Sequence, residues 1–300
     1  MIKNFNEMIA SVKSKRRLAL AVGKGYDEYD VFARVLKEGT ADCVFVGDKA
    51  EIEKKAKEVG VDVSKFEIMH HTGPDSETTL EAAKLVNQGK CDVLMKGRVH
   101  TDDFLRSILN KEFGLRTGQL LSHAFIMYPQ KMKRFFVVTD CAMNVAPTLP
   151  QKIEITKNAI ALTRALGIEQ PKVAVLAAVE VVNPKMPITL EAQEMSQMSD
   201  RGEFGNAIVQ GPFAFDNAVS EESARIKGIK NPVAGKADVL LMPDLEAGNI
   251  MFKTFAYWAE GQLSGLLLGA KKPVVLTSRS DSAETKFLSI VSAIYYDNFN

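Results

Sequence analysis

The residues best suited to binding or catalysis follow the short apolar runs of this sequence. They cluster in five segments, 98–102, 140–144, 211–216, 244–249 and 277–285. These segments offer hydroxyls and backbone amides close to predicted helix N termini, where free N–H groups and the helix dipole bind phosphate. Arg279 adds a planar fork of donors that suits a phosphate group. The pattern predicts an anion site at the carboxyl ends of strands, where open α/β sheets bind ligands.

Each of these segments also has a plainer interpretation. Ser278, Asp281 and Glu284 lie at capping spacing before a helix. Arg279 could instead form a surface salt bridge, and His100 is either a general base or a polar loop residue. Cys141 has no evident histidine partner, so covalent catalysis by this thiol has little support.

Several well-known site motifs are missing. The sequence has no HExxH or CxxC, and no His/Cys/Asp/Glu set at metal-ligand spacing, so no required metal is predicted. GxGxxG, GxxxxGK[ST] and the GxSxG elbow are also missing, which gives a Ser-His-Asp hydrolase little support. Gly23-Lys24-Gly25 resembles half of a phosphate loop, but the signal is weak.

The composition narrows the class of partner. The 300 residues are 46% hydrophobic, enough for a large core and about two domains. A net charge of +1 gives no general attraction to nucleic acid or to an anionic membrane, and no apolar run is long enough to span one. Three scattered cysteines, and no apolar run after the basic residues near the amino terminus, predict a cytoplasmic protein without disulfides.

Short apolar runs alternate with amphipathic stretches along the chain. The runs lie at 18–22, 43–47, 66–70, 92–97, 134–140, 173–182, 207–211, 238–244 and 273–278, and the first is followed by an amphipathic stretch at about 27–38. Unbroken apolar runs are typical of parallel strands covered on both faces, and their alternation with helices predicts an α/β fold. Asn144, Pro147 and Pro150 mark the best candidate boundary.

Five ordered motifs resemble the phosphate acetyl/butaryl transferase family along nearly the whole chain. They are CDVLMKGRVHTDDFLRSILN (91–110), VVTDCAMNVAPTL (137–149), VQGPFAFDNAVSEESA (209–224), KADVLLMPDLEAGNIMFK (236–253) and KPVVLTSRSDSAET (272–285). Details such as KGRVHT, SQMSDRG and LTSRSDSAETK are more similar to the butyryl-transferring branch than to the acetyl-transferring one.

The resemblance implies a two-domain, parallel-sheet-rich three-layer sandwich, similar to isocitrate and isopropylmalate dehydrogenases, with the active site in the interdomain cleft. The expected domains are residues 1–140 plus 277–300, and residues 141–276. No nicotinamide binding follows from that likeness. The family also implies a homo-oligomer.

The resemblance further implies reversible transfer of a short acyl group between coenzyme A and inorganic phosphate by direct attack in a ternary complex. The expected reaction is butyryl-CoA plus phosphate in equilibrium with butyryl phosphate plus coenzyme A. Coenzyme A would be a substrate, and no permanently bound cofactor is expected. Arg279 would hold the phosphate, while Ser278 would stabilise the oxyanion or thiolate. The expected substrate-binding residues are Gly97, His100, Thr101, Ser122, His123, Asp140, Asn144, Asp216 and Asn249.

One departure concerns the base for the thiol. Acetyltransferases of this family look like Ser-Arg followed by an aspartate seven residues after the serine, and Thr285 stands at that position here. Glu284, slightly favoured, and Asp281 are the carboxylates available nearby. Acetyl-CoA as donor, a nicotinamide-dependent hydroxyacid dehydrogenase and a non-catalytic coenzyme A sensor remain as alternatives.

Overall fold

The computed structural model describes residues 1–12, 16–26 and 28–299, and its chain forms two compact units. The first unit contains residues 5–119 and 264–300, and the second contains residues 1–4 and 120–263. The main divisions therefore fall near residues 119 and 263, whereas the sequence placed them at 140 and 276. Antiparallel pairing accounts for the difference, because it joins β5 to β6 in the second unit and β10 to β11 in the first.

The first unit is built on a mostly parallel sheet. Its strands are β1 (Arg17–Ala21), β2 (Asp42–Gly47), β3 (Glu67–His70), β4 (Val93–Lys96), β11 (Val274–Val275) and most of β10 (Gly261–Leu268), in the order β3-β2-β1-β4-β11-β10. Its helices are α1 (Phe5–Ser11), α2 (Asp30–Glu38), α3 (Lys49–Glu58), the 3₁₀ turn η1 (Val63–Lys65), α4 (Asp75–Asn87), α5 (Thr101–Ile108) and α11 (Ala283–Asp297). Only β10 runs antiparallel to its neighbour β11. Position 27, where the sequence predicts the start of an amphipathic stretch, lies outside the described residues.

The second unit is also a helix-covered sheet. Its strands are β5 (Ser122–Pro129), β6 (Phe136–Thr139), β7 (Lys172–Leu176), β8 (Ile208–Phe213) and β9 (Val239–Leu241), in the order β5-β6-β9-β7-β8. Its helices are α6 (Leu149–Ala165), α7 (Pro187–Asp200), α8 (Phe215–Val219), α9 (Glu221–Ile226) and α10 (Leu245–Trp258). The β5–β6 pair is antiparallel, and the pairs from β6 to β8 are parallel. The expected α/β class is confirmed.

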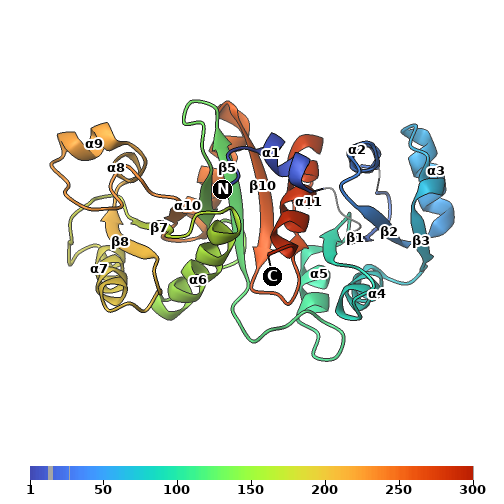
Figure 1. The fold of residues 1–300 in the computed structure, drawn as a ribbon. Helices are drawn as coiled ribbons and strands as arrows, with labels where there is room; N and C mark the ends of the chain where they lie inside the picture. The colour runs from blue at the N-terminus through green and yellow to red at the C-terminus, as the bar shows by residue number, and fades with distance from the viewer. Residues whose placement is uncertain (13–15, 27, 300) are drawn as a thin grey trace. The chain divides into compact units, whose positions relative to one another are not determined.

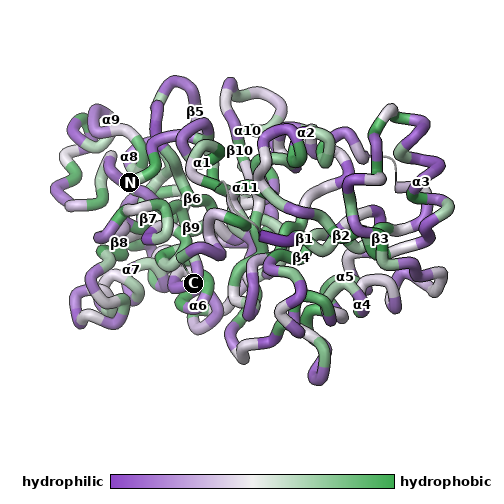
Figure 2. Tube along the Cα trace, turned by 45° about the vertical axis from the view of Figure 1, so that its right-hand side comes forward, coloured by the Kyte–Doolittle hydropathy of each residue, from purple (hydrophilic) through white to green (hydrophobic). Residues whose placement is uncertain are grey.

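Helices cover both faces of the first unit's sheet. On one side α11 packs against α1, α2, β4 and β11, and on the other α4 contacts β1, β2, β4 and α5 (Figure 1). The strands are among the most hydrophobic parts of the chain (Figure 2). Burial on both faces explains why these strands read as unbroken apolar runs.

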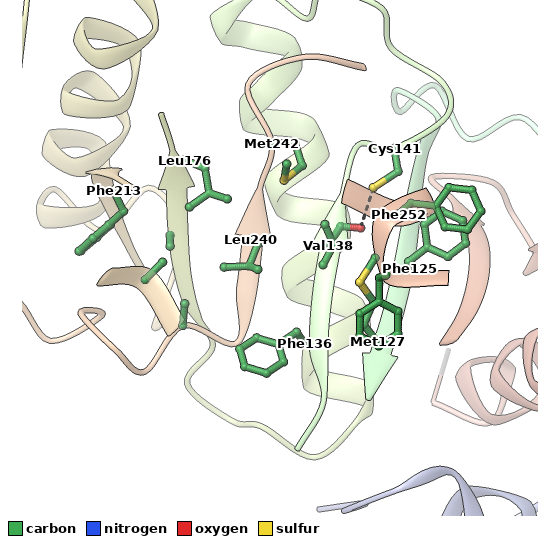
Figure 3. Packing of buried hydrophobic residues seen from close by; sticks show 14 of the residues in the cluster. Phe125, Met127, Phe136, Val138, Cys141, Leu176, Phe213, Leu240, Met242 and Phe252 are labelled. Atoms are coloured by element: carbon green, nitrogen blue, oxygen red, sulfur yellow. Dashed lines mark hydrogen bonds between the residues drawn. The ribbon is translucent and has the colours of Figure 1, made fainter. Parts of the chain in front are cut away.

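The second unit has its own apolar core. Phe125, Phe136, Val138 and Leu240 project from neighbouring strands onto one face of the sheet, where they meet α10 (Figure 3). The Phe125 ring stacks on Phe252 of α10 with 4.0 Å between centroids. Across the parts of the chain that the structure describes, no helix has the length and apolarity that a membrane crossing demands.

Candidate active site

A cavity of about 210 Å³ lies at the carboxyl ends of three neighbouring strands of the first unit. We call it the anion cavity; its lining residues are Tyr26, Glu28, Lys96, Gly97, Arg98, Thr277, Ser278, Arg279 and Lys286. β4 pairs in parallel with both β1 and β11, so the loops that follow these strands meet at one edge of the sheet. This is where open α/β sheets bind ligands, as the sequence predicted.

Close backbone packing holds the loops after β1 and β4 together. The Gly97 N–H donates to the carbonyl oxygen of Ala21 at 3.0 Å. A Cβ on Gly23 would lie 1.9 Å from the carbonyl oxygen of Arg98, so only glycine fits at that position. The Arg98 guanidinium in turn donates to the Gly25 carbonyl at 2.7 Å. The weak glycine signal at 23–25 therefore marks a loop that packs against Arg98 of the cavity lining, although none of its three residues lines the cavity itself.

Positive charge dominates the lining. Lys96, Arg98, Arg279 and Lys286 are cations, and Glu28 is the one carboxylate among the lining residues. The Lys286 ammonium donates to Glu28 at 2.5 Å, whereas none of the described residues pairs with the Arg279 guanidinium. A surplus of positive charge in a small polar cavity favours an anionic ligand.

Two lining groups have shifted pKa values. Burial lowers the pKa of Lys96, and the neighbouring charge of Arg279 lowers it further, while Glu28 opposes the shift. Burial also raises the pKa of Tyr26 well above its ordinary value, with Glu28 adding to the effect. Desolvation disfavours the charged form in both cases. Lys96 is therefore a better proton donor than an exposed lysine, and Tyr26 is a poorer one than an exposed tyrosine.

The turn after β11 is braced by its own polar side chains. The Ser278 N–H donates to Asp281 at 2.8 Å, and its hydroxyl lies 3.0 Å from that of Ser280. Ser282 caps α11 by accepting from the Thr285 N–H at 3.1 Å. Asp281 thus holds the turn that presents Ser278 to the cavity.

The predicted carboxylate bases are engaged in other contacts. Glu284 forms an ion pair with Arg34 of α2, and that guanidinium also stacks over the Phe287 ring at 3.9 Å. Glu284 and Asp281 are both outside the residues that line the anion cavity. Thr285 is buried, and its hydroxyl contacts Ser282. The geometry therefore gives none of these three side chains a direct route to a ligand in the cavity.

Of the remaining predicted residues of the first unit, the one that precedes α5 by several positions lines the anion cavity, and the two at the start of α5 do not. Gly97 lines the cavity, whereas His100 and Thr101 do not. His100 is the exposed N-cap of α5, and its side chain makes no capping hydrogen bond.

Five predicted residues of the second unit lie around the turn after β6. Asp140 accepts hydrogen bonds from the N–H groups of His123, Ala142 and Met143 and from the Asn144 side chain. These bonds measure 2.6–3.2 Å, and Asp140 is only 3% exposed. The buried carboxylate therefore organises the 140–144 turn.

The neighbours of this turn are held in the same way. Ser122 accepts from Asn158 at 3.0 Å, and Asn249 donates to the Cys141 carbonyl at 3.3 Å. A Cβ on Gly248 would lie 2.1 Å from the carbonyl oxygen of Asp140, so α10 begins in close contact with the turn. Burial raises the pKa of Cys141 well above its ordinary value, which makes this thiol a poor nucleophile.

Asp216 lies in a different part of the second unit. Its carboxylate accepts from the Ser223 hydroxyl and pairs with Lys227 at 3.2 Å. These contacts lower the pKa of Asp216, the hydrogen bond from Ser223 most of all. The Asp216 side chain therefore links α8 to α9 and to the residue that follows α9.

The structure adds six residues to the predicted site: Tyr26, Glu28, Lys96, Arg98, Thr277 and Lys286. Lys96 could have been predicted from the sequence, since it is a charged residue that ends an apolar run. Lys286 and Glu28 could not, because they come together only when α11 packs against α2.

Comparison with known proteins gives consistent matches. The model of the phosphate acetyl/butaryl transferase family matches residues 74–294. A phosphate butyryltransferase of Clostridium acetobutylicum is 48% identical, covering 98% of each chain. A phosphate acetyltransferase of Thermotoga maritima is 40% identical, covering 97% of this chain and 99% of its own.

Solved structures agree in fold. A branched-chain phosphotransacylase from Enterococcus faecalis is 32% identical, with a TM-score of 0.84, over 94% of this chain and 99% of its own. A 4-hydroxythreonine-4-phosphate dehydrogenase described as putative, from Salmonella typhimurium, is similar in fold alone, at 12% identity and a TM-score of 0.58 over 94% of this chain and 99% of its own.

Proposed function

This chain belongs to the phosphate acetyl/butaryl transferase family, and on that premise we propose that butyryl-CoA is its preferred acyl donor. The chain reversibly transfers an acyl group between coenzyme A and inorganic phosphate. Its identity to two phosphate butyryltransferases from Clostridium species, 48% and 44%, is higher than to the acetyltransferase from Thermotoga maritima, 40%, and this difference supports the preference. Acetyl-CoA is the second candidate donor.

We propose that the anion cavity binds the phosphoryl group. The observation that carries this assignment is the position of Arg279 beside Lys96, with no carboxylate partner for either cation among the described residues. Arg279 would hold the phosphate, or the phosphoryl end of the acyl phosphate, in line with the carbonyl carbon. Such orientation can contribute about 7–11 kcal/mol to lowering the barrier.

In the proposed reaction a phosphate oxygen attacks the thioester carbonyl within a ternary complex, and the thiolate of coenzyme A leaves. Ser278 and the backbone amides of its turn would stabilise the charge that develops on the carbonyl oxygen or on sulfur. Asp281 would act through Ser278, whose N–H it accepts. Coenzyme A enters as a substrate.

The other predicted residues have either structural or substrate-binding roles in this proposal. Ser122, His123 and Asp140 are buried, which favours a structural role around the 140–144 turn. Asn144, Asn249, Asp216, His100 and Thr101 remain proposed substrate contacts. The homo-oligomer, the cytoplasmic location and the likeness to isocitrate and isopropylmalate dehydrogenases also remain predictions.

Thiol release tests the proposal. Purified chain is mixed with butyryl-CoA or acetyl-CoA, with and without phosphate, and free coenzyme A is measured with a thiol reagent. We expect phosphate-dependent release, faster with butyryl-CoA. Arg279→Ala should lose at least about 100-fold in kcat/KM for phosphate, because hydrogen bonds to a charged ligand contribute about 1.5–3 kcal/mol each.

Arg106→Ala is the matched control, since the Arg106 side chain is exposed in the same unit and lies outside the cavity. An Arg279→Ala variant as active as this control would contradict the assigned phosphate site. Equal or faster release from acetyl-CoA would contradict the butyryl preference. Binding of coenzyme A without turnover of any acyl chain would instead support the sensor alternative.

A further inference from the structure

Lys96 is a buried cation without a carboxylate partner. The residue is 6% exposed and lines the anion cavity. Its ammonium donates to the Gly97 carbonyl at 3.2 Å, and no other described residue is recorded as its hydrogen-bond or ion-pair partner. A buried charge of this kind is costly unless it is paired. An anionic ligand in the cavity would supply the missing partner.

The other lining groups are poorly suited to proton transfer. Glu28 is held by Lys286, and burial keeps the pKa of Tyr26 well above its usual range. Arginine side chains do not deprotonate in proteins, which removes Arg98 and Arg279. Lys96 remains as a cation of the lining that is free of ion pairs and able to give up a proton.

From this geometry we propose that Lys96 is a catalytic residue, which binds the phosphoryl group and transfers the proton that moves between phosphate and the sulfur of coenzyme A. The inference rests on the proposed phosphate site. It assigns to a lysine of β4 the proton transfer that the sequence had assigned to a carboxylate of the turn after β11.

The reactants of the proposed step are acyl-CoA and the hydrogen phosphate dianion. A lone pair on a phosphate oxygen forms the new C–O bond, and the C–S electron pair leaves with sulfur. The Lys96 ammonium gives one proton to that sulfur, and the proton carried by the phosphate replaces it on Lys96. The products are the acyl phosphate dianion and the coenzyme A thiol, and Lys96 ends as it began.

The charges around Lys96 determine the expected pH dependence. Besides burial, Arg279 and Lys286 lower its pKa, and Glu28 and Asp75 raise it. Arg279 lies in the turn after β11, Lys286 in α11, Glu28 in the segment before α2, and Asp75 in α4. Arg98 and Tyr26 are the remaining ionisable residues of the cavity lining. The proposal requires the ammonium form. Accordingly, kcat/KM should fall as pH rises through the lowered pKa of Lys96, in both directions of the reaction.

Three variants separate charge from proton transfer. Lys96→Arg keeps the charge, so its Kd for inorganic phosphate, measured by calorimetry, should stay within about tenfold of wild type. Its kcat for thiol release should fall at least about 100-fold, because a fixed guanidinium cannot relay the proton. Lys96→Met should lose about 10–150-fold in phosphate affinity as well. Lys96→Ala should recover turnover with added primary amines, at rates that depend on the pKa of the amine.

Lys54→Met is the control, because Lys54 is an exposed lysine of α3 outside the cavity. Wild-type kcat in Lys96→Arg, or wild-type phosphate affinity in Lys96→Met, would overturn the inference. If arginine does not fit at position 96, the Lys96→Ala variant provides the test. Failure of primary amines to restore its turnover would overturn the proposed proton transfer. Wild-type protein that releases no thiol would overturn the proposed function instead, and the phosphate affinities would still test the role of Lys96 in binding.

Discussion

Lys286 of α11 and Glu28, which precedes α2, form an ion pair of 2.5 Å in the lining of the anion cavity. The two residues are 258 positions apart in the sequence. The Lys286 side chain is almost completely buried, while that of Glu28 is one-third exposed. The pair thus joins distant segments and also sets the charge that Lys96 experiences.

Glu28→Gln should change both the pH profile and the stability. Glu28 raises the pKa of Lys96, so its neutralisation lowers that pKa further, and the alkaline limb of kcat/KM should move to lower pH. Loss of a charged hydrogen bond to Lys286 should cost about 1.5–3 kcal/mol in urea unfolding. Glu53→Gln, on the exposed face of α3, should leave both properties unchanged. An alkaline limb that stays in place or moves to higher pH would be inconsistent with this role.

Glu284→Gln and Asp281→Asn should have different effects. Glu284 pairs with Arg34 away from the cavity lining, so kcat should change by less than about threefold and stability by about 0–1 kcal/mol. Asp281 holds the Ser278 N–H, so its amide variant should lower kcat about tenfold by loosening the turn. The kcat of each variant is measured by steady-state kinetics at saturating phosphate. A large loss of kcat in Glu284→Gln would restore the carboxylate base predicted from the sequence.

Asp140→Asn should destabilise the second unit. The buried carboxylate accepts four hydrogen bonds, and an amide would place its own NH₂ against one of these donors. We expect a loss of about 3 kcal/mol, seen as a lower melting temperature. Asp200→Asn serves as the control, because the exposed Asp200 accepts one hydrogen bond within the described part of the chain, from Gln210. Equal melting temperatures for the two variants would show that the Asp140 network contributes little.

The native cysteines should not react with thiol reagents. Cys43, Cys91 and Cys141 are buried, and burial raises the pKa of Cys91 to about 11 and those of the other two as well. Folded protein should therefore give almost no signal in the coenzyme A assay, and denatured protein should show three thiols. Iodoacetamide should leave activity intact. Inactivation that acyl-CoA prevents would point to a reactive Cys141.

The sequence predicted the first three strands of the chain best, where strands and helices alternate regularly. The runs at 18–22, 43–47 and 66–70 correspond within one residue at each end to β1, β2 and β3. It missed β5 and β10, whose antiparallel pairs lie outside the repeating strand–helix pattern and whose sequences include His123, Ser264 and Gly265. The predicted run 173–182 was too long, since β7 ends at Leu176.

The site was predictable only in part, for a physical reason. Ser278 and Arg279 follow β11 directly, so the rule that ligands bind at strand ends located them. Glu284 was predicted from its distance along the chain, but helical geometry turns it toward Arg34 instead. Lys286 and Glu28 meet through the packing of α11 on α2, a tertiary contact that no local pattern encodes.

The first unit combines residues 5–119 with residues 264–300, and the anion cavity takes side chains from both segments. On the ribosome, Lys96 is made long before Arg279 and Lys286. Until α11 leaves the exit tunnel, the nascent chain has only two of the four cations that line the cavity. Premature termination or clipping before β11 would therefore yield a fragment that cannot assemble the cavity.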